Sequence, residues 1–390
     1  MPPRGASADP ATQISDRCGA FDTCVASSMS NFRPLREFCR RDEEESWKLA
    51  GVTVSESFIA GLPKAELHVH HVGSVSQRVV AELASRHPGT VPNDPAELAR
   101  FFVFDDLSHF IRNYLAVVDL IKTAEDVRFI TYEVAVDMAA QHIRYAELTV
   151  TPYISINDGL PAEAFLEAIE DARQAANRDH GLELRWIFDI PADFGIPAAE
   201  LTASVALDHD VPGLIGFGLG GSDLGFPRSM FRSQFDRARA AGLHSVPHAG
   251  ETAGPESVWE ALRSLGAERI EHGIGGVGDQ RLLDHLAERE IALDLCLTSN
   301  VALRVVSDFD HHPIRELVAA GVPVTINTDD PPMFGTDLNT EYVIAARLLD
   351  LDERGVTELA LAAVDASFAG AEIKSALRAE ISSYVATRTP

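Results

Sequence analysis

The chain has 390 residues, of which 46% are hydrophobic, and its formal net charge of −26 is strongly acidic. Such acidity argues against nucleic acid and against an anionic membrane surface as partners, because both need clustered Lys and Arg. No apolar run approaches the roughly 18–20 residues of a membrane span, and the N-terminus lacks the apolar stretch of a secretory signal. The four cysteines fit neither a zinc ribbon nor a dense disulfide framework, which predicts a cytoplasmic location.

Residues 1–55 differ in composition from the rest of the sequence. Pro, Ser and Ala dominate the start, and a charge-dense run follows at residues 40–45. Such a composition buries little apolar surface and is typical of poorly ordered segments. We therefore predict an N-terminal extension over residues 1–55 and a single folded domain over residues 56–390.

From residue 61 onward, short apolar runs alternate with amphipathic helical patterns. The strand-like runs cover residues 65–70, 143–150, 182–190, 213–219, 243–248, 269–272, 291–296 and 322–327. The helical patterns between them cover residues 124–141, 162–179, 228–241, 256–265, 279–288 and 313–320. This alternation predicts an α/β protein with the TIM (β/α)₈ barrel fold. A helical insertion at residues 94–120 is expected to roof the barrel, and helices over residues 338–386 are expected to pack outside it.

Three histidines and an aspartate at the ends of three runs form a candidate metal site. His68 and His70 lie two apart on the first run, so their side chains share a face, whereas His71 should point the other way. His248 ends the fifth run and Asp329 follows the eighth, at the strand ends where barrel enzymes place their sites. Taken singly, His68 and His70 also fit a polar pair at a strand end, and His248 also fits a hydrogen-bonded histidine of the core. Together they suit one Zn²⁺ per chain, which would lower the pKa of a bound water toward about 7.

Three further residues at strand ends are suited to proton transfer. Glu251 lies three residues after His248, and a dry pocket there would raise the pKa of its carboxyl and keep it protonated. His272 ends the sixth run and is placed to orient or deprotonate water. Asp330 directly follows the proposed metal ligand of the eighth run. As alternatives, Glu251 also fits a carboxylate at a helix N-terminus, and Asp330 also fits a helix N-cap.

Two compositional features narrow the chemistry. The only lysines are Lys48, Lys64, Lys122 and Lys374, so none lies on the second to eighth strand-like runs. A Schiff-base lyase, or a hydrolase whose two metals share a carboxylated lysine, is therefore disfavoured. Residues 216–221 match G-x-G-x-x-G, which alone suggests a dinucleotide loop. At the end of a barrel strand, close backbone approach to a flat ligand or a tight turn is the better interpretation.

Together, these motifs resemble the adenosine deaminase family of purine deaminases. The matching segments are LPKAELHVH at residues 62–70, HAGE at 248–251, LTSN at 297–300 and NTDDP at 327–331. The resemblance covers about residues 58–386, and the four segments together are highly specific. It implies a barrel that holds one Zn²⁺ on His68, His70, His248 and Asp329.

The same resemblance implies a role for each remaining site residue in the deamination of a 6-aminopurine. Glu251 would protonate N1 of the purine, and His272 would assist the water that attacks C6. Asp330 would position that water and bind N7, the backbone of Gly221 would meet N3, and His70 would lie beside the substrate. The H-x-E and P-C-x-x-C signature of zinc cytidine deaminases is absent from the sequence.

One departure from the family bears on the substrate. Val72 stands where adenosine deaminases have an acid that binds the ribose 5′-hydroxyl, and its side chain offers no acceptor. We therefore expect a 5′-modified substrate with an apolar extension. Residues 71–74, His-Val-Gly-Ser, resemble the actinobacterial aminodeoxyfutalosine deaminases of menaquinone biosynthesis, which implies that aminodeoxyfutalosine is converted to futalosine. Arg78 and Arg112 are candidates for binding a carboxylate of this substrate.

Other features keep alternatives open. Glu271 stands where Gly usually precedes the catalytic histidine, and adenine deaminases resemble the chain there and at residues 300–306. Adenosine and the free base adenine are thus alternative substrates. Leu297 replaces a usual Pro, which affects only the local backbone. A non-catalytic nucleoside-binding member of the family is disfavoured because all three proton-transfer residues are present. The oligomeric state is left open.

Overall fold

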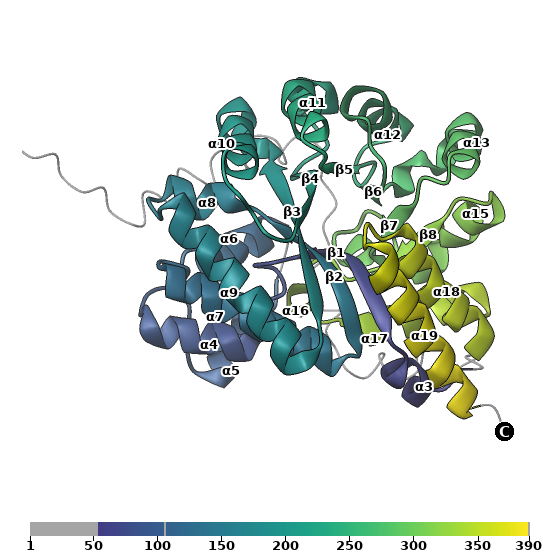
Figure 1. Cartoon of the computed structure of the whole chain (residues 1–390), viewed down its shortest axis with the longest axis horizontal. Coiled ribbons are helices and arrows are strands. Elements are labelled where there is room, and N and C mark those ends of the chain that lie inside the picture. Colours follow the sequence, from purple (N-terminus) through teal and green to yellow (C-terminus); the bar gives the residue numbers. More distant parts are fainter. Residues whose placement is uncertain (1–53, 105–106, 389–390) are drawn as a thin grey trace, which may run out of the picture.

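The computed structural model describes residues 54–104 and 107–388. Eight parallel strands lie in sequence order at its centre, each paired with the next, and helices surround them (Figure 1). The arrangement confirms the predicted TIM barrel. The strands are β1 (Lys64–His70), β2 (Ile143–Val150), β3 (Glu183–Pro191), β4 (Leu214–Gly220), β5 (His244–Ala249), β6 (Ile270–His272), β7 (Leu293–Leu295) and β8 (Val324–Ile326). The predicted N-terminal extension lies outside the described residues, apart from residues 54–55.

The first and last strands meet at the end of the barrel where the candidate site residues lie. Val69 and Asp329 form a parallel bridge. The N–H of His70 donates to the carbonyl of Asp329 at 2.9 Å, and the N–H of Asp329 donates to the carbonyl of His68 at 3.2 Å. Asp329 adopts a positive φ of 66°, which is uncommon for a residue with a side chain. The chain thus turns sharply after β8, directly beside the two histidines of β1.

The helices agree with most of the predicted patterns. In chain order they are α3 (Glu56–Gly61), α4 (Gln77–Arg86), α5 (Pro95–Phe101), α6 (Leu107–Val118), α7 (Ala124–Ala140), α8 (Pro152–Asn157), α9 (Ala162–His180), α10 (Gly195–Leu207), α11 (Arg232–Ala240), α12 (Pro255–Glu260), α13 (Gln280–Glu288), α14 (Leu297–Ala302), α15 (Ile314–Ala319), α16 (Pro331–Phe334), α17 (Leu338–Leu349), α18 (Glu353–Ala366) and α19 (Ala371–Arg388). The pattern at residues 228–241 begins as a 3₁₀ turn, η3 (Arg228–Phe231), and the pattern at 256–265 ends as a π-helix, η4 (Ala261–Leu265). The sequence patterns did not include α10, which packs against β3.

The insertion between β1 and β2 reaches over the end of the barrel that carries the candidate site. Phe110 of α6 stacks on Phe334 of α16, with ring centroids 5.4 Å apart. One turn further along α6, Tyr114 lines a small cavity together with His70 and Val72. Aromatic side chains therefore hold α6 against the segments that follow β1 and β8, as expected for a roof.

The C-terminal helices complete the outer ring. Helix α18 packs against β1 and β8, and α19 packs against α18 (Figure 1).

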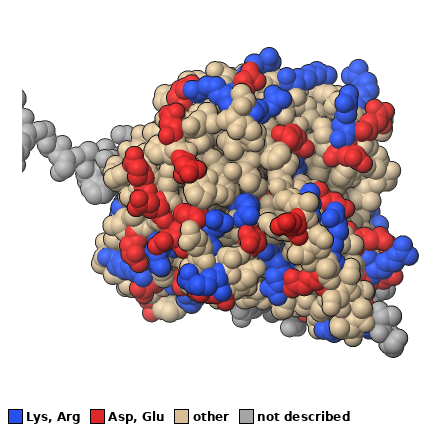
Figure 2. Space-filling model, viewed as in Figure 1, with Lys and Arg blue, Asp and Glu red and all other residues tan. Residues whose placement is uncertain are grey.

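Acidic and basic side chains are interspersed over the face of the molecule in Figure 2, although acidic residues predominate in the whole sequence. Among the described residues, none of the helices combines the length and apolarity needed to cross a membrane.

A group of charged side chains, which we call the Arg269 network, lies inside the barrel, deeper than the candidate site. Arg269 Nε donates to Asp294 Oδ2 at 2.6 Å, and its Nη2 donates to Glu147 Oε2 at 2.6 Å. Thr325 Oγ1 donates to the other oxygen of Asp294 at 2.6 Å. The remaining oxygen of Glu147 accepts from the hydroxyl of Tyr145 at 2.8 Å. Each buried charge of the network is thus matched by a partner within the chain.

Candidate active site

The predicted metal ligands converge at the end of the barrel. His68 and His70 come from β1, His248 from β5, and Asp329 from the turn after β8. One potential ligand atom of each lies within 4.8 Å of the corresponding atoms of the other three. Residues that are up to 261 positions apart in the sequence therefore meet as the set that the sequence predicts.

The local geometry of these atoms fits a cation. Nε2 of His70 lies 3.1 Å from Nε2 of His248 and 3.2 Å from Oδ1 of Asp329. Nε2 of His68 is buried and has no hydrogen-bond partner. A buried polar atom of this kind is uncommon and needs an explanation. Three imidazole nitrogens and one carboxylate oxygen directed into one small space are the ligand set that Zn²⁺ prefers. The residues present therefore fit a zinc ion.

Neighbouring groups hold the ligands in these orientations. Nδ1 of His68 lies 3.2 Å from the carbonyl oxygen of Asp294, so this nitrogen donates and Nε2 is left for a metal. Ser299 Oγ donates to Asp329 Oδ2 at 2.6 Å. Nδ1 of His248 lies 2.5 Å from Oε2 of Glu271. Partners of this kind fix the ring orientation and increase the basicity of the metal-bound nitrogen.

Glu271, whose role the sequence left open, is explained by its position. It lies beside His248 in the parallel register of β5 and β6, so the two side chains share the barrel interior. Thr149 Oγ1 donates to Oε1 of Glu271 at 3.2 Å. Burial alone would raise the pKa of Glu271, but the neighbouring His248 and His68 lower it to about 2. Glu271 is therefore an ionised carboxylate that supports a ligand histidine. Sequence reasoning missed this role because pairing between adjacent strands is not visible in one chain segment.

Glu251 and His272 lie together at the edge of the metal-binding group. Nε2 of His272 is 3.7 Å from Oε1 of Glu251 and 3.9 Å from Oδ2 of Asp329. Burial raises the pKa of Glu251 and lowers the pKa of His272 to about 4. A carboxyl with a raised pKa beside a neutral imidazole is arranged to donate a proton. The proton-transfer roles of Glu251 and His272 stay predictions.

Asp330 presents an unpaired oxygen to the same space. Its Oδ1 is buried without a hydrogen-bond partner, and burial together with the neighbouring Asp329 raises its pKa to about 7. A Cβ at Gly73 would lie only 1.4 Å from Oδ1 of Asp330, so the side chain occupies room that only a glycine leaves. A buried carboxyl oxygen without a partner is uncommon, so Asp330 Oδ1 is a candidate contact for a bound molecule.

A polar cluster that the sequence analysis did not identify fixes the loop of Glu251. Asp223 accepts hydrogen bonds from the N–H groups of Glu251 and Thr252 at 2.9 and 3.2 Å, and from Ser257 Oγ at 2.8 Å. Arg228 Nη1 donates to the carbonyl of His248 at 3.2 Å. Asp223 lies two residues after the glycine-rich segment. No sequence pattern near Asp223 predicts its contact with the loop that follows β5.

The glycines at residues 216–221 serve close packing. A Cβ at Gly216 would lie 2.9 Å from the side chain of Ile187, and a Cβ at Gly221, whose φ is 83°, would lie 2.2 Å from Asp193 Oδ2. The strand ends at Gly220, and no helix begins directly after it, unlike a dinucleotide-binding turn. The segment is therefore not a dinucleotide-binding turn, and these two glycines make room for neighbouring side chains; the predicted approach of the backbone to a flat ligand stays a prediction.

Val72 lies where the site extends beneath the roof. The small cavity beside it is lined by His70, His71, Val72, Tyr114, Val118, Ile121, Thr149, Thr151, Ile154 and Ser155. His71 points away from the metal ligands, as predicted, since its Nε2 lies 2.8 Å from Thr131 Oγ1 of α7. The two candidate arginines do not line this cavity. Arg78 pairs with Glu133 at 2.7 Å with its side chain 59% exposed, and Arg112 is exposed.

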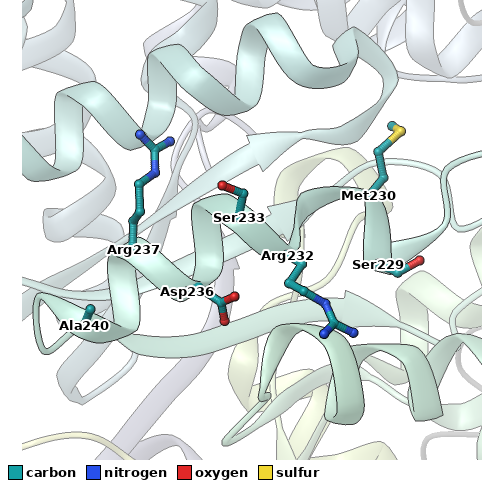
Figure 3. Close-up of a pocket in the computed structure, with 7 residues that line it drawn as sticks. All are labelled: Ser229, Met230, Arg232, Ser233, Asp236, Arg237 and Ala240. Carbon is teal, nitrogen blue, oxygen red and sulfur yellow. The ribbon is translucent and has the colours of Figure 1, made fainter.

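A second, shallow hollow lies along η3 and α11, on the outside of the barrel (Figure 3). It is lined by Ser229, Met230, Arg232, Ser233, Asp236, Arg237 and Ala240. None of the predicted site residues lines it. His68 Nε2 and Asp330 Oδ1, which are buried without a hydrogen-bond partner, lie away from this hollow, at the end of the barrel that carries the candidate site.

Comparison with known sequences agrees with this geometry. The family model described as adenosine deaminase matches residues 63–384. An aminodeoxyfutalosine deaminase of Streptomyces avermitilis is 60% identical over 333 residues, which cover 85% of this chain and 93% of that protein. An adenosine deaminase of Klebsiella pneumoniae is 34% identical over 324 residues, which cover 82% of this chain and 97% of that protein.

Solved structures share the fold over most of the chain. An adenine deaminase from Arthrobacter aurescens superposes with a TM-score of 0.78 at 29% identity, covering 84% of this chain and 100% of that one. An amidohydrolase from Burkholderia ambifaria with bound Zn superposes with a TM-score of 0.80 at 25% identity, covering 87% of this chain and 96% of that one.

Proposed function

The chain belongs to the adenosine deaminase family, and from this premise we propose that it is a zinc-dependent aminohydrolase which deaminates the 6-amino group of a purine nucleoside. The observation that carries the proposal is 60% identity with an aminodeoxyfutalosine deaminase over 85% of the chain. The convergence of four metal-binding side chains beside Glu251 and His272 supports it. We propose one Zn²⁺ per chain as the metal.

The proposed roles follow from the environment of each side chain. Zn²⁺ held by His68, His70, His248 and Asp329 would activate water as a nucleophile near neutral pH. Glu251, whose pKa is raised by burial, would donate a proton to N1 of the purine ring.

Contacts on the ring would orient it for this transfer. Asp330, with its unpaired Oδ1, would bind at N7, and the backbone N–H of Gly221 would donate to N3. Together these contacts place the amino-bearing carbon over the metal-binding group. The product then keeps the purine ring and has oxygen in place of the amino group.

We propose aminodeoxyfutalosine as the substrate, on the basis of Val72 and its surroundings. Val118, Ile121 and Ile154 line the small cavity beside Val72, and Val72 itself offers no acceptor for a free 5′-hydroxyl, which favours a substrate with an apolar 5′ extension. The alternatives are adenosine and adenine. The acidic residue Glu271 was the reason to consider adenine as a substrate. Its contact with His248 gives it another role, the support of a proposed metal ligand, and this role does not depend on the substrate.

A turnover panel tests the proposed substrate. Purified, zinc-loaded protein is assayed for ammonia release from aminodeoxyfutalosine, 5′-methylthioadenosine, adenosine and adenine. We expect the highest kcat/KM for aminodeoxyfutalosine, since only this compound carries the full 5′ extension. A far higher kcat/KM for adenosine would show that Val72 does not determine the substrate, and a preference for adenine would establish the free-base alternative.

We also propose that residues 56–390 act as one domain and that the protein works in the cytoplasm. The barrel supports the first proposal, because the segment after its last strand forms a bridge with its first strand. The acidic sequence, with a net charge of −26, supports a small-molecule substrate without a nucleic-acid partner.

A further inference from the structure

A chain of polar groups leads away from the ring of His272. Asn300 Nδ2 lies 3.3 Å from His272 Nδ1, and Asn300 Oδ1 lies 3.1 Å from His312 Nε2. The backbone nitrogen of Ile314 lies 3.2 Å from His312 Nδ1. The three side chains are at most 5% exposed, so water does not compete for these contacts. We call Asn300 and His312, with the N–H of Ile314, the His312 relay.

The direction of each hydrogen bond in the relay follows from its outer end. A backbone N–H only donates, so Nδ1 of His312 must accept from Ile314. The neutral ring of His312 then carries its proton on Nε2 and donates it to Asn300 Oδ1. Asn300 consequently turns its amide NH₂ group toward His272, whose Nδ1 accepts. A neutral His272 ring must therefore carry its proton on Nε2.

The inner end of the relay agrees with this assignment. Nε2 of His272 faces Oδ2 of Asp329 at 3.9 Å, and a carboxylate oxygen accepts hydrogen bonds when ionised. Burial lowers the pKa of His312 to about 4, which keeps this outer ring neutral near pH 7. The groups on the two sides of His272 thus favour the same tautomer independently.

The relay is built into the segment that also holds a metal ligand. Asn300 lies on α14 next to Ser299, whose hydroxyl donates to Asp329 Oδ2. His312 lies directly after η6 (Phe309–His311), and only Pro313 separates it from α15. The N–H groups of Val305 and Val306 donate to the carbonyl of Asn300, so the chain turns back on itself directly after α14. Two adjacent residues of α14 therefore orient a metal ligand and the neighbouring histidine.

We propose that Asn300 and His312 are positioning residues which fix His272 as a hydrogen-bond donor toward the reacting atoms. This inference rests on the proposed deaminase function and chooses between the two roles, orienting or deprotonating water, that the sequence left open for His272. With its proton on Nε2, the ring donates to the oxygen of the attacking water and cannot take up that water's proton. The proton must then pass to a carboxylate of the site. In the opposite tautomer, the Nδ1–H of His272 would point at the NH₂ group of Asn300, so that two hydrogen-bond donors would face each other.

The tautomer of His272 is measurable without turnover. Two-bond ¹H–¹⁵N NMR spectra of the zinc-loaded, full-length protein with ¹⁵N-labelled histidine rings distinguish the Nε2–H from the Nδ1–H form, and His272→Gln assigns the signal. We expect the Nε2–H pattern for His272 near neutral pH. An Nδ1–H pattern, or a doubly protonated ring, overturns the proposal.

Asn300→Asp replaces the hydrogen-bond donor that faces Nδ1 of His272 with an acceptor. The shape of the side chain is kept and His312 still finds an acceptor, but a carboxylate oxygen now faces Nδ1 of His272 and favours the opposite tautomer. We expect the NMR pattern of His272 to switch. We also expect kcat for aminodeoxyfutalosine to fall by about 10²-fold or more with KM nearly unchanged. Asn93→Asp adds the same charge at an exposed position and should keep the wild-type kcat.

The opposite kinetic result contradicts the relay. If His272 works as a base, an aspartate behind it strengthens the base, and Asn300→Asp keeps or increases kcat. His312→Phe removes the outer anchor, so we expect a mixture of His272 tautomers and a smaller loss of kcat. An unchanged, pure Nε2–H pattern in that variant would remove His312 from the proposal. If the wild-type protein released no ammonia from any purine, the proposed function would fail, whereas the tautomer would still test the relay.

Discussion

Two layers of the same barrel interior bury charged side chains in different ways. In the Arg269 network, Arg269 lies 2.6 Å from oxygens of both Glu147 and Asp294, and Thr325 supports the second acid. One layer nearer the strand ends, His68 Nε2 and Asp330 Oδ1 are buried without partners. Both layers have polar residues at strand positions that face the interior.

The difference shows what marks a site in this protein. Burial of charge alone does not, because the Arg269 network is as buried as the metal-binding group and needs nothing more. The convergence of several such residues does mark it: single unpaired buried atoms also occur elsewhere among the described residues, as at Trp186 Nε1 and Gln234 Oε1, but His68 Nε2 lies in one small space with potential ligand atoms of three other side chains. We therefore expect changes in the outer layer to affect catalysis and metal binding, and changes in the deeper layer to affect stability.

The largest effect is expected from Glu251→Gln in the outer layer. The amide keeps the shape of the carboxyl but cannot donate a proton to the purine, so kcat should fall by about 10³-fold or more. Zinc content and the free energy of unfolding should stay close to the wild-type values. Ammonia-release kinetics and metal analysis measure both. Glu256→Gln, an exposed change in the same region, is the control. A Glu251→Gln variant that keeps its activity would remove Glu251 from the mechanism.

Arg269→Met should have the opposite signature. It leaves Glu147 and Asp294 buried without a counter-charge, which is expected to lower the free energy of unfolding by about 3–5 kcal/mol. The protein that folds should retain most of its kcat, because the network touches no unpaired site atom. Urea unfolding followed by circular dichroism measures the loss. Arg281→Met, whose side chain is 89% exposed in the native protein, should change stability very little. Equal losses in both variants would contradict the account of the network.

A smaller and more specific effect is expected for Glu271→Gln. The amide no longer attracts the Nδ1–H of His248 as strongly, so the zinc dissociation constant should increase by about 10- to 100-fold. Competition with a chelator measures this constant independently of turnover, and Glu271→Asp should recover part of the affinity. If zinc binds as tightly to Glu271→Gln as to the wild type, the contact with His248 does not support the metal.

Val72→Asp should produce the smallest change, confined to substrate choice. A carboxylate beneath the roof supplies the acceptor that a free 5′-hydroxyl needs, and it opposes an apolar extension. We expect the ratio of kcat/KM for adenosine to that for aminodeoxyfutalosine to increase by about 10- to 100-fold, with zinc content unchanged. Val72→Ala controls for the loss of the side chain. An unchanged ratio would place the determinant of the 5′ group elsewhere.

The sequence predicted the strands and the convergence of the four proposed metal ligands because both depend on local spacing. His68 and His70 share a face through the two-residue period of a strand, and Asp329 lies where a barrel strand ends. By contrast, the contact of Glu271 with His248 depends on the register between neighbouring strands. No spacing along the chain encodes that register.

The same reason accounts for the other features that the sequence did not predict. The link from His272 through Asn300 to His312 joins the end of β6, helix α14 and the residue after η6, and the bonds of Asp223 to the Glu251 loop join two loops. Arg78 was a candidate for a substrate carboxylate because it lies near the roof in the sequence. In the fold it pairs with Glu133 on the exposed side of α7. Proximity in sequence therefore did not predict the direction of this side chain.

A zinc titration of the metal-free protein tests the central claim most directly. Bound zinc and ammonia release from aminodeoxyfutalosine are measured on the same samples as Zn²⁺ is added. If the unpaired atoms of the outer layer form a single site, activity should rise from near zero in parallel with bound zinc and saturate at one ion per chain. Full activity without metal, or activity that requires two ions per chain, would contradict this account of the site.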